Sequence, residues 1–188
     1  MSSEAEDHPA SARGPVPRWL ERGVVALCVI VVVVAMGLVL TFGHGRDQSI
    51  YALVARETLA GGMPYRDAFD FKPPGIFAVY AVSRALFGAS PLGIRVLEVG
   101  AMIATTVLLL RLARRELGMP LAGWIAAALA CGVHAQLDFW HTAQPETFGE
   151  PLGLGALALA AEAARAPSAR RRAALLGAAG VLLGIALE

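Results

Sequence analysis

Residues 23–42 read GVVALCVIVVVVAMGLVLTF, a run of 20 residues without a charged side chain. A helix of this length is about as long as the roughly 30 Å hydrocarbon core of a bilayer is thick. The apolar region of a cleaved signal peptide is shorter, about 7–15 residues, and ends in a small-residue cleavage site. We therefore predict a retained transmembrane helix over residues 21–42.

The composition of the whole chain agrees with a membrane protein. The 188 residues are 56% hydrophobic, above the roughly 45–50% that is usual for soluble domains. The net charge of +1 gives no reason to expect a nucleic-acid partner. Cys28 and Cys131 both lie in apolar runs, where they are interpreted as small hydrophobic side chains and not as a disulfide or metal ligands. The predicted fold class is all-α, a polytopic transmembrane helical bundle with the lipid bilayer as its surroundings.

Arginine clusters at 111–115 and 165–172 orient the later helices, because basic loops tend to face the cytoplasm. Two spans between these clusters place both on that side. The apolar run 76–88 is short and contains Arg84, so we interpret it as a re-entrant or interfacial helix. The predicted organisation is a disordered cytoplasmic tail at 1–17, a membrane domain at 18–188, spans at 21–42, 92–112, 119–138 and 147–164, another span beginning near 173, and an outer loop at 43–91 with short juxtamembrane helices.

Two further features concern the origin of the chain. Its basic residues are arginine with one exception, and alanine and glycine are abundant, which indicates a GC-rich bacterial genome. For a multi-pass bacterial protein with a cytoplasmic N-terminus, the expected location is the plasma (inner) membrane. The last apolar run, 173–187, is short for a span and is followed only by Glu188. We therefore expect a fragment of a longer polytopic protein.

The outer loop carries the first candidate site residues. Asp47 follows the first span closely and can be either a helix cap, as can Ser49, or a carboxylate that acts as a general base. Lys72 is the only lysine and precedes Pro73 and Pro74, which disfavour a helix through it. A compact ammonium group on such a stiff segment suits a phosphate. The alternative is a lysine that snorkels to the membrane interface.

A polar break at 141–150 interrupts the later apolar runs on the same predicted face. Glu146 follows Pro145 and begins a helix, with Glu150 one turn later. The helix dipole accounts for one acid in a first turn. Burial of a second acid, Glu150, at membrane depth costs free energy, so its presence indicates a functional role. His141 is open between a structural and a binding role.

The order of residues across the loop resembles a known family. The pattern is Asp47-Gln48, Tyr51, Ala55, Gly61-Gly62, Pro64-Tyr65, Asp67, Asp70, Lys72-Pro73-Pro74, Phe87-Gly88 and Arg95. It is similar to the N-terminal part of the GT-C glycosyltransferases, over residues 20–165. The nearest subgroup is the dolichyl-phosphate-mannose protein mannosyltransferases and aminoarabinose transferases, with relatives that act on the lipopolysaccharide core.

This resemblance implies transfer of a sugar from a polyprenyl-phosphate donor to a glycolipid or protein acceptor at the outer face, with inversion. Asp47 and Glu146 then match the catalytic acids, and Lys72 matches the lysine that meets the lipid phosphate. Further substrate-binding candidates are Tyr65, Asp67, Asp70, His141 and Glu150. The family often has two adjacent acids where this chain has Asp47-Gln48, so a divalent metal is not supported and no cofactor is predicted.

Two other functional classes are also consistent with the sequence. A transporter subunit would use Glu146 and Glu150 as intramembrane ion or proton groups, although no internal repeat is evident. A non-catalytic membrane protein is the third possibility, because the chain stops within an apolar run.

Overall fold

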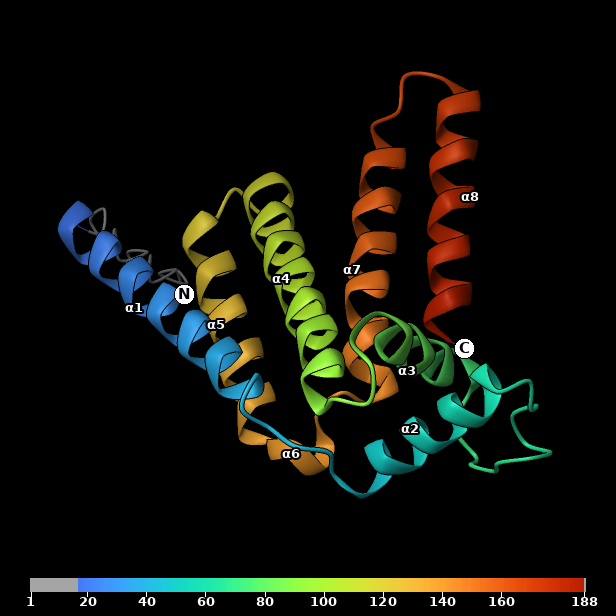
Figure 1. The fold of residues 1–188 in the computed structure, drawn as a ribbon. Coiled ribbons are helices and arrows are strands. Elements are labelled where there is room, and N and C mark those ends of the chain that lie inside the picture. The colour runs from blue at the N-terminus through green and yellow to red at the C-terminus, as the bar shows by residue number, and fades with distance from the viewer. Residues whose placement is uncertain (1–16, 188) are drawn as a thin grey trace, which may run out of the picture.

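The computed structural model describes residues 17–187, and all of its regular elements are helices (Figure 1). The predicted tail at 1–17 lies outside the described residues except for Pro17. The helices are α1 (Arg18–Val39), α2 (Arg46–Leu59), α3 (Pro74–Phe87), α4 (Pro91–Glu116), α5 (Pro120–Gln136), α6 (Asp138–His141), α7 (Pro145–Ala164) and α8 (Ala169–Ala186). The all-α prediction is therefore confirmed for the described part of the chain.

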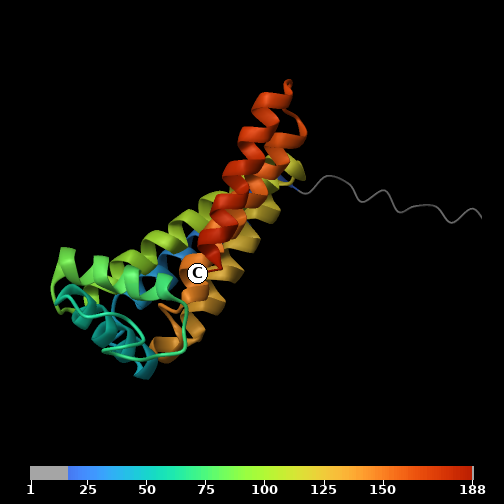
Figure 2. The same ribbon diagram turned by 90° about the vertical axis from the view of Figure 1, so that its right-hand side faces the viewer.

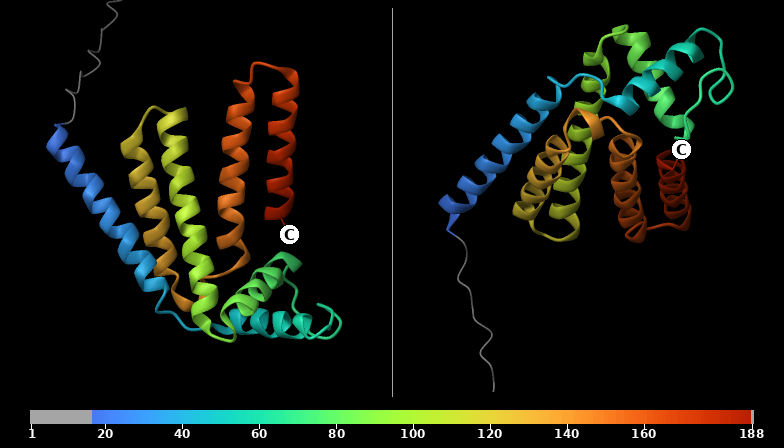
Figure 3. Two further views of the ribbon diagram at one scale, coloured as in Figure 1. Left: turned by 45° about the horizontal axis from the view of Figure 1, so that its top comes forward. Right: turned by 90° about the horizontal axis from the view of Figure 1, so that it is seen from below.

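The five long helices stand side by side in the order α1, α5, α4, α7, α8, so chain order and spatial order differ (Figures 1 and 3). The α2–α3 pair lies across one end of this row, as the view turned by 90° shows (Figure 2). The α5–α7 connection, which includes α6, reaches the same end. The loop after α1 and the polar break before α7 are therefore neighbours in space.

Two of the described helices have both the length and the apolar composition to cross a membrane. They are α1, with 22 residues, and α4, with 26 residues. Large apolar side chains on α1 point away from the rest of the protein: Leu27 is 61% exposed, Ile30 58% and Val33 62%. Such a surface is suited to lipid and not to water. The predicted spans at 119–138, 147–164 and 173 correspond to α5, α7 and α8, and their crossing of the bilayer stays a prediction.

The α2–α3 pair packs around an apolar core that also includes Ile94 of α4 and Ala143. Tyr51 and Val54 recur on one face of α2, and Ile76, Phe77 and Tyr80 do so on α3, with the three- and four-residue spacing of a helix. All five are at most 3% exposed, and Tyr51 meets Tyr80 edge-on at a ring-centroid distance of 5.5 Å. Full burial of such a side chain contributes about 1.5–3 kcal/mol. This core holds α2 and α3 together as a folded unit.

The start of α2 differs from the predicted cap. Gly45 is the N-cap residue, and its N–H donates to Oε1 of Gln48 at 2.7 Å. The hydroxyl of Ser49 donates to the carbonyl of Gly45. Asp47 makes no hydrogen bond with the residues that the structure describes, so the capping alternative for Asp47 is wrong. Its carboxylate remains available for another role.

Gly45 also lies too close to α6 to accept a side chain. A Cβ atom there would be 2.6 Å from the carbonyl oxygen of Phe139 and 2.8 Å from Cα of Trp140, and both are backbone atoms that cannot turn aside. We expect Gly45→Ala to destabilise the protein by about 1–3 kcal/mol, the usual cost of overpacking. Thermal unfolding in detergent measures the change. Gly43→Ala is the control, since a Cβ there meets nothing within 4 Å; equal unfolding midpoints would contradict the prediction.

Candidate functional site

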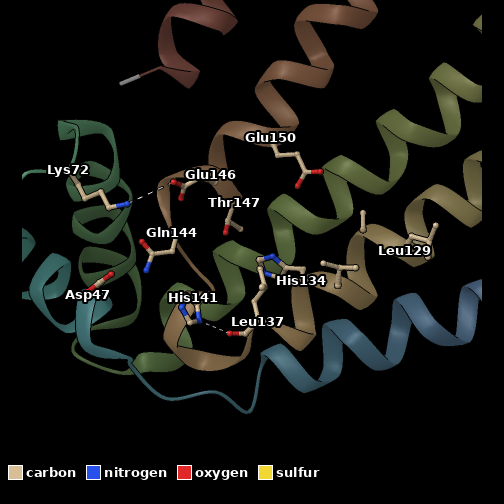
Figure 4. Close-up of a pocket in the computed structure, with 12 residues that line it drawn as sticks. Asp47, Lys72, Leu129, His134, Leu137, His141, Gln144, Glu146, Thr147 and Glu150 are labelled. Carbon is tan, nitrogen blue, oxygen red and sulfur yellow. Dashed lines mark hydrogen bonds and ion pairs between the residues drawn. The ribbon is translucent and has the colours of Figure 1, made fainter.

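A cavity of about 840 Å³ lies where the start of α2, the loop before α3, α5 and the start of α7 meet (Figure 4). Five of the sequence-predicted site residues line it: Asp47, Lys72, His141, Glu146 and Glu150. They come from segments that are up to 103 residues apart, from position 47 to position 150. Tyr65, Asp67 and Asp70 are not among the lining residues.

Lys72 is held by its backbone and leaves its ammonium group exposed to the cavity. Its N–H donates to Oδ1 of Asp70 at 3.0 Å, and its carbonyl accepts the hydroxyl of Tyr65 at 2.8 Å. Pro73 then caps α3, and Pro74 is the first residue of that helix. The predicted rigid segment around Lys72 is therefore present, and Asp70 and Tyr65 contribute to it.

The ammonium group of Lys72 faces Glu146 across the cavity. Its Nζ lies 3.9 Å from Oε1 of Glu146, whose side chain is 77% exposed (Figure 4). An ion pair with an exposed partner contributes little, about 0–1 kcal/mol. A stronger anion, such as a phosphate, can therefore replace Glu146 as the partner of Lys72 at small cost.

Asp67 stabilises the turn that contains Met63 and Arg66. Its Oδ2 accepts the N–H of Met63 at 2.8 Å, and its carboxylate pairs with Arg66 at 2.6 Å. The Arg66 side chain and then the Met63 N–H hold the pKa of Asp67 below its usual value. These contacts account for Asp67 as a turn residue, and its predicted binding role stays a prediction.

Tyr51 connects the Asp47 end of the cavity to the start of α7. Its hydroxyl donates to Oε1 of Gln144 at 2.7 Å. Burial, and then the negative charges of Asp47, Asp70 and Glu146, raise the pKa of Tyr51. The hydroxyl of Tyr51 therefore keeps its proton and donates it in the bond to Gln144. The negative charges of the three carboxylates all raise the pKa of this hydroxyl.

Behind the cavity lies a buried polar cluster that the sequence interpretation did not assign to the site. We call Arg95, Glu98, Gln48 and Thr142 the Arg95 cluster; all four are 0% exposed. The Arg95 guanidinium donates to Oε2 of Glu98, to the hydroxyl of Thr142 and to Oε1 of Gln48, each at 2.7 Å. It also donates to the carbonyls of Phe42 and Gly43. One side chain thus ties together the end of α1, the start of α2, α4 and the segment before α7.

Glu98 extends this cluster to the segment that carries Glu146. Its Oε1 accepts the N–H of Ala143 at 2.6 Å and Nε2 of His134 at 2.8 Å. The carbonyl of Ala143 accepts the hydroxyl of Tyr80 at 3.1 Å, and the carbonyl of Thr142 accepts the amide of Gln48. Ala143 has φ of +52°, which is costly for a residue with a side chain. The many bonds hold this strained turn, and α7 starts from it at a fixed place.

The stability of the protein should depend on pH through His44, which lies in the α1–α2 linker. Burial and then the positive charge of Arg95 lower the pKa of His44 from 6.5. The unfolded chain therefore binds a proton at His44 where the folded protein does not, and stability falls as pH drops below about 6.5. We expect His44→Asn to lose part of this acid sensitivity in unfolding midpoints measured between pH 8 and 5. His141→Asn is the control, and equal acid sensitivity of all three proteins would refute the assignment.

The described residues hold no group of three or more His, Cys, Asp or Glu side chains placed for a metal ion. Helices with membrane-spanning length, together with a cavity that is lined by both Asp47 and Lys72, indicate a membrane protein with a polar site at one end of its helix row. The sequence profile of the family described as dolichyl-phosphate-mannose-protein mannosyltransferase matches residues 71–188, more than half of the chain. The chain belongs to this family, which confirms the resemblance. No curated protein and no solved structure matches the chain.

Membership of this family implies a membrane glycosyltransferase that uses a polyprenyl-phosphate sugar donor. The matched residues include Lys72, Glu98, His134 and Glu146, whereas Asp47 lies before them. The Arg95 cluster is the part of the site that sequence reasoning missed. A signal was present in the sequence, because two opposite charges three residues apart directly precede the uncharged run 99–110 of α4.

Proposed function

We propose that the protein transfers a sugar from a polyprenyl-phosphate donor to a glycolipid or protein acceptor at the outer face of a bacterial plasma membrane. The observation that carries this proposal is the shared cavity of Asp47 and Lys72, in which the exposed Glu146 is the only ion-pair partner of Lys72 among the described residues. The cavity thereby combines a free carboxylate with an ammonium group whose partner can be exchanged.

The two groups have complementary parts in such a transfer. The acceptor hydroxyl attacks the anomeric carbon, and the bond between that carbon and the phosphate oxygen breaks with its electron pair on the phosphate. Asp47 takes the hydroxyl proton as general base. The charge of Lys72 offsets the negative charge that develops on the leaving phosphate. A single displacement of this kind inverts the anomeric configuration.

The outer wall of the cavity suits the lipid part of the donor. Leu129, Val133 and Leu137 recur every four residues on one face of α5 and are 63%, 60% and 47% exposed. They make a continuous apolar strip beside the polar groups. An isoprenoid chain on this strip would bring its phosphate to the end of α5, near the loop that carries Lys72.

The orientation in the membrane is argued from charge. The α4–α5 connection follows Arg111, Arg114 and Arg115, and the α7–α8 connection contains Arg165. Both connections lie at the end of the helix row opposite the cavity (Figures 1 and 3). If basic connections face the cytoplasm, the cavity faces outward. This supports an outer site, with the N-terminus in the cytoplasm.

Removal of the Lys72 ammonium group tests the donor site. A hydrogen bond to a charged group contributes about 1.5–3 kcal/mol, so we expect Lys72→Ala to weaken the binding of polyprenyl phosphate in nanodiscs by about 10- to 100-fold. Lys72→Arg should retain most of the affinity. Arg66→Ala is the matched control, because Arg66 is an exposed base of the same loop outside the cavity.

The experiment also separates the competing classes. Unchanged binding by Lys72→Ala would remove Lys72 from the donor site. If the wild-type protein moved ions across a vesicle membrane and transferred no sugar, the transporter class would replace this proposal.

A further inference from the structure

The inner side of the cavity, against α4, holds a second group of polar side chains, which we call the His134 subsite: His134 on α5 with Thr147 and Glu150 on α7. All three line the main cavity and also a narrow extension that continues between α4, α5 and α7. Figure 4 shows them on the opposite side of Glu146 from Lys72. Lys72 is the only lysine or arginine among the lining residues of the main cavity, and none lines the extension.

The hydrogen bonds of Glu98 determine which nitrogen of His134 carries a proton. Oε2 of Glu98 accepts the Arg95 guanidinium, and Oε1 accepts the backbone N–H of Ala143. Both partners can only donate, so the carboxylate is an acceptor on both oxygens. Nε2 of His134 therefore donates to Glu98, which leaves Nδ1 as the ring nitrogen that is not bonded to Glu98.

Nδ1 of His134 faces the cavity. It makes no hydrogen bond with the described residues, and no side-chain nitrogen or oxygen buried among those residues lacks a partner. Nδ1 is therefore not enclosed, in agreement with the 16% exposure of the side chain. The buried Glu98 thus orients the ring and directs its second nitrogen into the cavity.

Glu150 and Thr147 complete the chemistry of this subsite. The carboxylate of Glu150 makes no hydrogen bond or ion pair within residues 17–187, and neither does the hydroxyl of Thr147. The subsite therefore offers a carboxylate, a ring nitrogen and a hydroxyl group that can donate or accept. An anion would be repelled by Glu150 and by the nearby Glu98, whereas a ligand rich in hydroxyl groups would satisfy every one of these atoms.

We propose that the His134 subsite binds hydroxyl groups of the donor's sugar ring, while the phosphate lies at Lys72. This assignment rests on the proposed function. The apolar strip of α5 then takes the isoprenoid chain on the outer side, and the sugar lies on the inner side against α4. Glu98 acts through His134 as a positioning residue, because it fixes the ring without reaching the cavity.

The test compares two kinds of lipid in nanodiscs: dolichyl phosphate, and dolichyl phosphate that carries mannose, glucose or arabinose. We expect the wild-type protein to bind at least one sugar-bearing form more tightly than the bare phosphate. Glu150→Ala should reduce this preference about tenfold, the effect of losing one hydrogen bond to a charged group, and should not weaken the binding of the bare phosphate. Lys72→Ala should weaken binding of both kinds of lipid.

A second variant addresses the imidazole itself. His134→Phe keeps an aromatic ring but loses Nδ1, and it should also lower the preference for the sugar-bearing form. His134→Phe also removes the hydrogen bond to Glu98. Glu150→Ala is therefore the decisive variant, because Glu150 makes no hydrogen bond with the described residues and its replacement breaks no such contact. If Glu150→Ala keeps the full preference, or if the wild type binds both lipids equally, the subsite is wrong. If the wild type binds neither lipid, the proposed function fails first.

Discussion

Replacement of Asp47 by asparagine is expected to lower sugar-transfer turnover by about 10²–10⁴-fold, the usual contribution of general base catalysis. The amide has nearly the same shape as the carboxylate but cannot take the proton of the acceptor. Because Asp47 makes no hydrogen bond with the described residues, the change breaks no structural contact. Single-turnover transfer from a polyprenyl-phosphate donor in nanodiscs measures the effect, and donor binding should stay within about twofold if Asp47 acts only on the proton.

Glu57→Gln is the matched control, since Glu57 is an acid of the same helix whose partner is the adjacent exposed Arg56. It should leave turnover unchanged. If Asp47→Asn turned over like the wild type while Glu146→Gln did not, the base would be Glu146. Glu146 also lines the cavity and is highly exposed.

Replacement of Arg95 by methionine should destabilise the protein by about 3–5 kcal/mol. Removal of one partner of a buried ion pair leaves the other charge without compensation, and Arg95 and Glu98 are both fully buried. Arg95→Lys keeps the charge but cannot make the five hydrogen bonds of the guanidinium at once. It should therefore lose part of the stability and part of the transfer activity. Thermal unfolding in detergent and single-turnover transfer measure the two effects.

Arg115→Met is the control for Arg95→Met, because Arg115 is an exposed arginine at the other end of the same helix. Equal unfolding midpoints for the two variants would show that the Arg95 cluster adds nothing to stability. A variant that loses activity but not stability would instead indicate that Arg95 positions the α2 and α7 starts without stabilising the whole fold.

Periodicity and charge were sufficient to predict the helices and the two segments that meet at the site. The uninterrupted apolar run of α1, the arginine clusters and the short run of α3 predicted that the 43–91 loop and the 141–150 break lie on the same face of the membrane. Proline and glycine positions also predicted the stiff segment at Lys72. These features depend on residues close together in the chain, so a sequence pattern contains them.

The Arg95 cluster could not be derived in the same way. In the sequence, Arg95 and Glu98 are two charges near one end of a predicted span. The partners of Arg95, Gln48 and Thr142, lie 47 residues before and 47 residues after it. Only the packing of α4 between α5 and α7 brings those partners together. The orientation of the His134 ring is a further step removed, since it follows from the hydrogen bonds of Glu98. Tyr65 and Asp70 differ from this cluster, because their partner is close to them in the chain. Both form hydrogen bonds with the backbone of Lys72.

The distances in sequence within the Arg95 cluster also set an order of assembly during synthesis. Arg95 and Glu98 can meet each other and the 42–48 segment as soon as the start of α4 has been made. Their remaining partners, Thr142 and the N–H of Ala143, are added 47 and 45 residues later, after α5. Until then these buried charges have incomplete partners, and Glu146 has not been synthesised. The pair in α4 is thus synthesised well before the 142–144 turn, and that turn completes the hydrogen bonds of the Arg95 cluster.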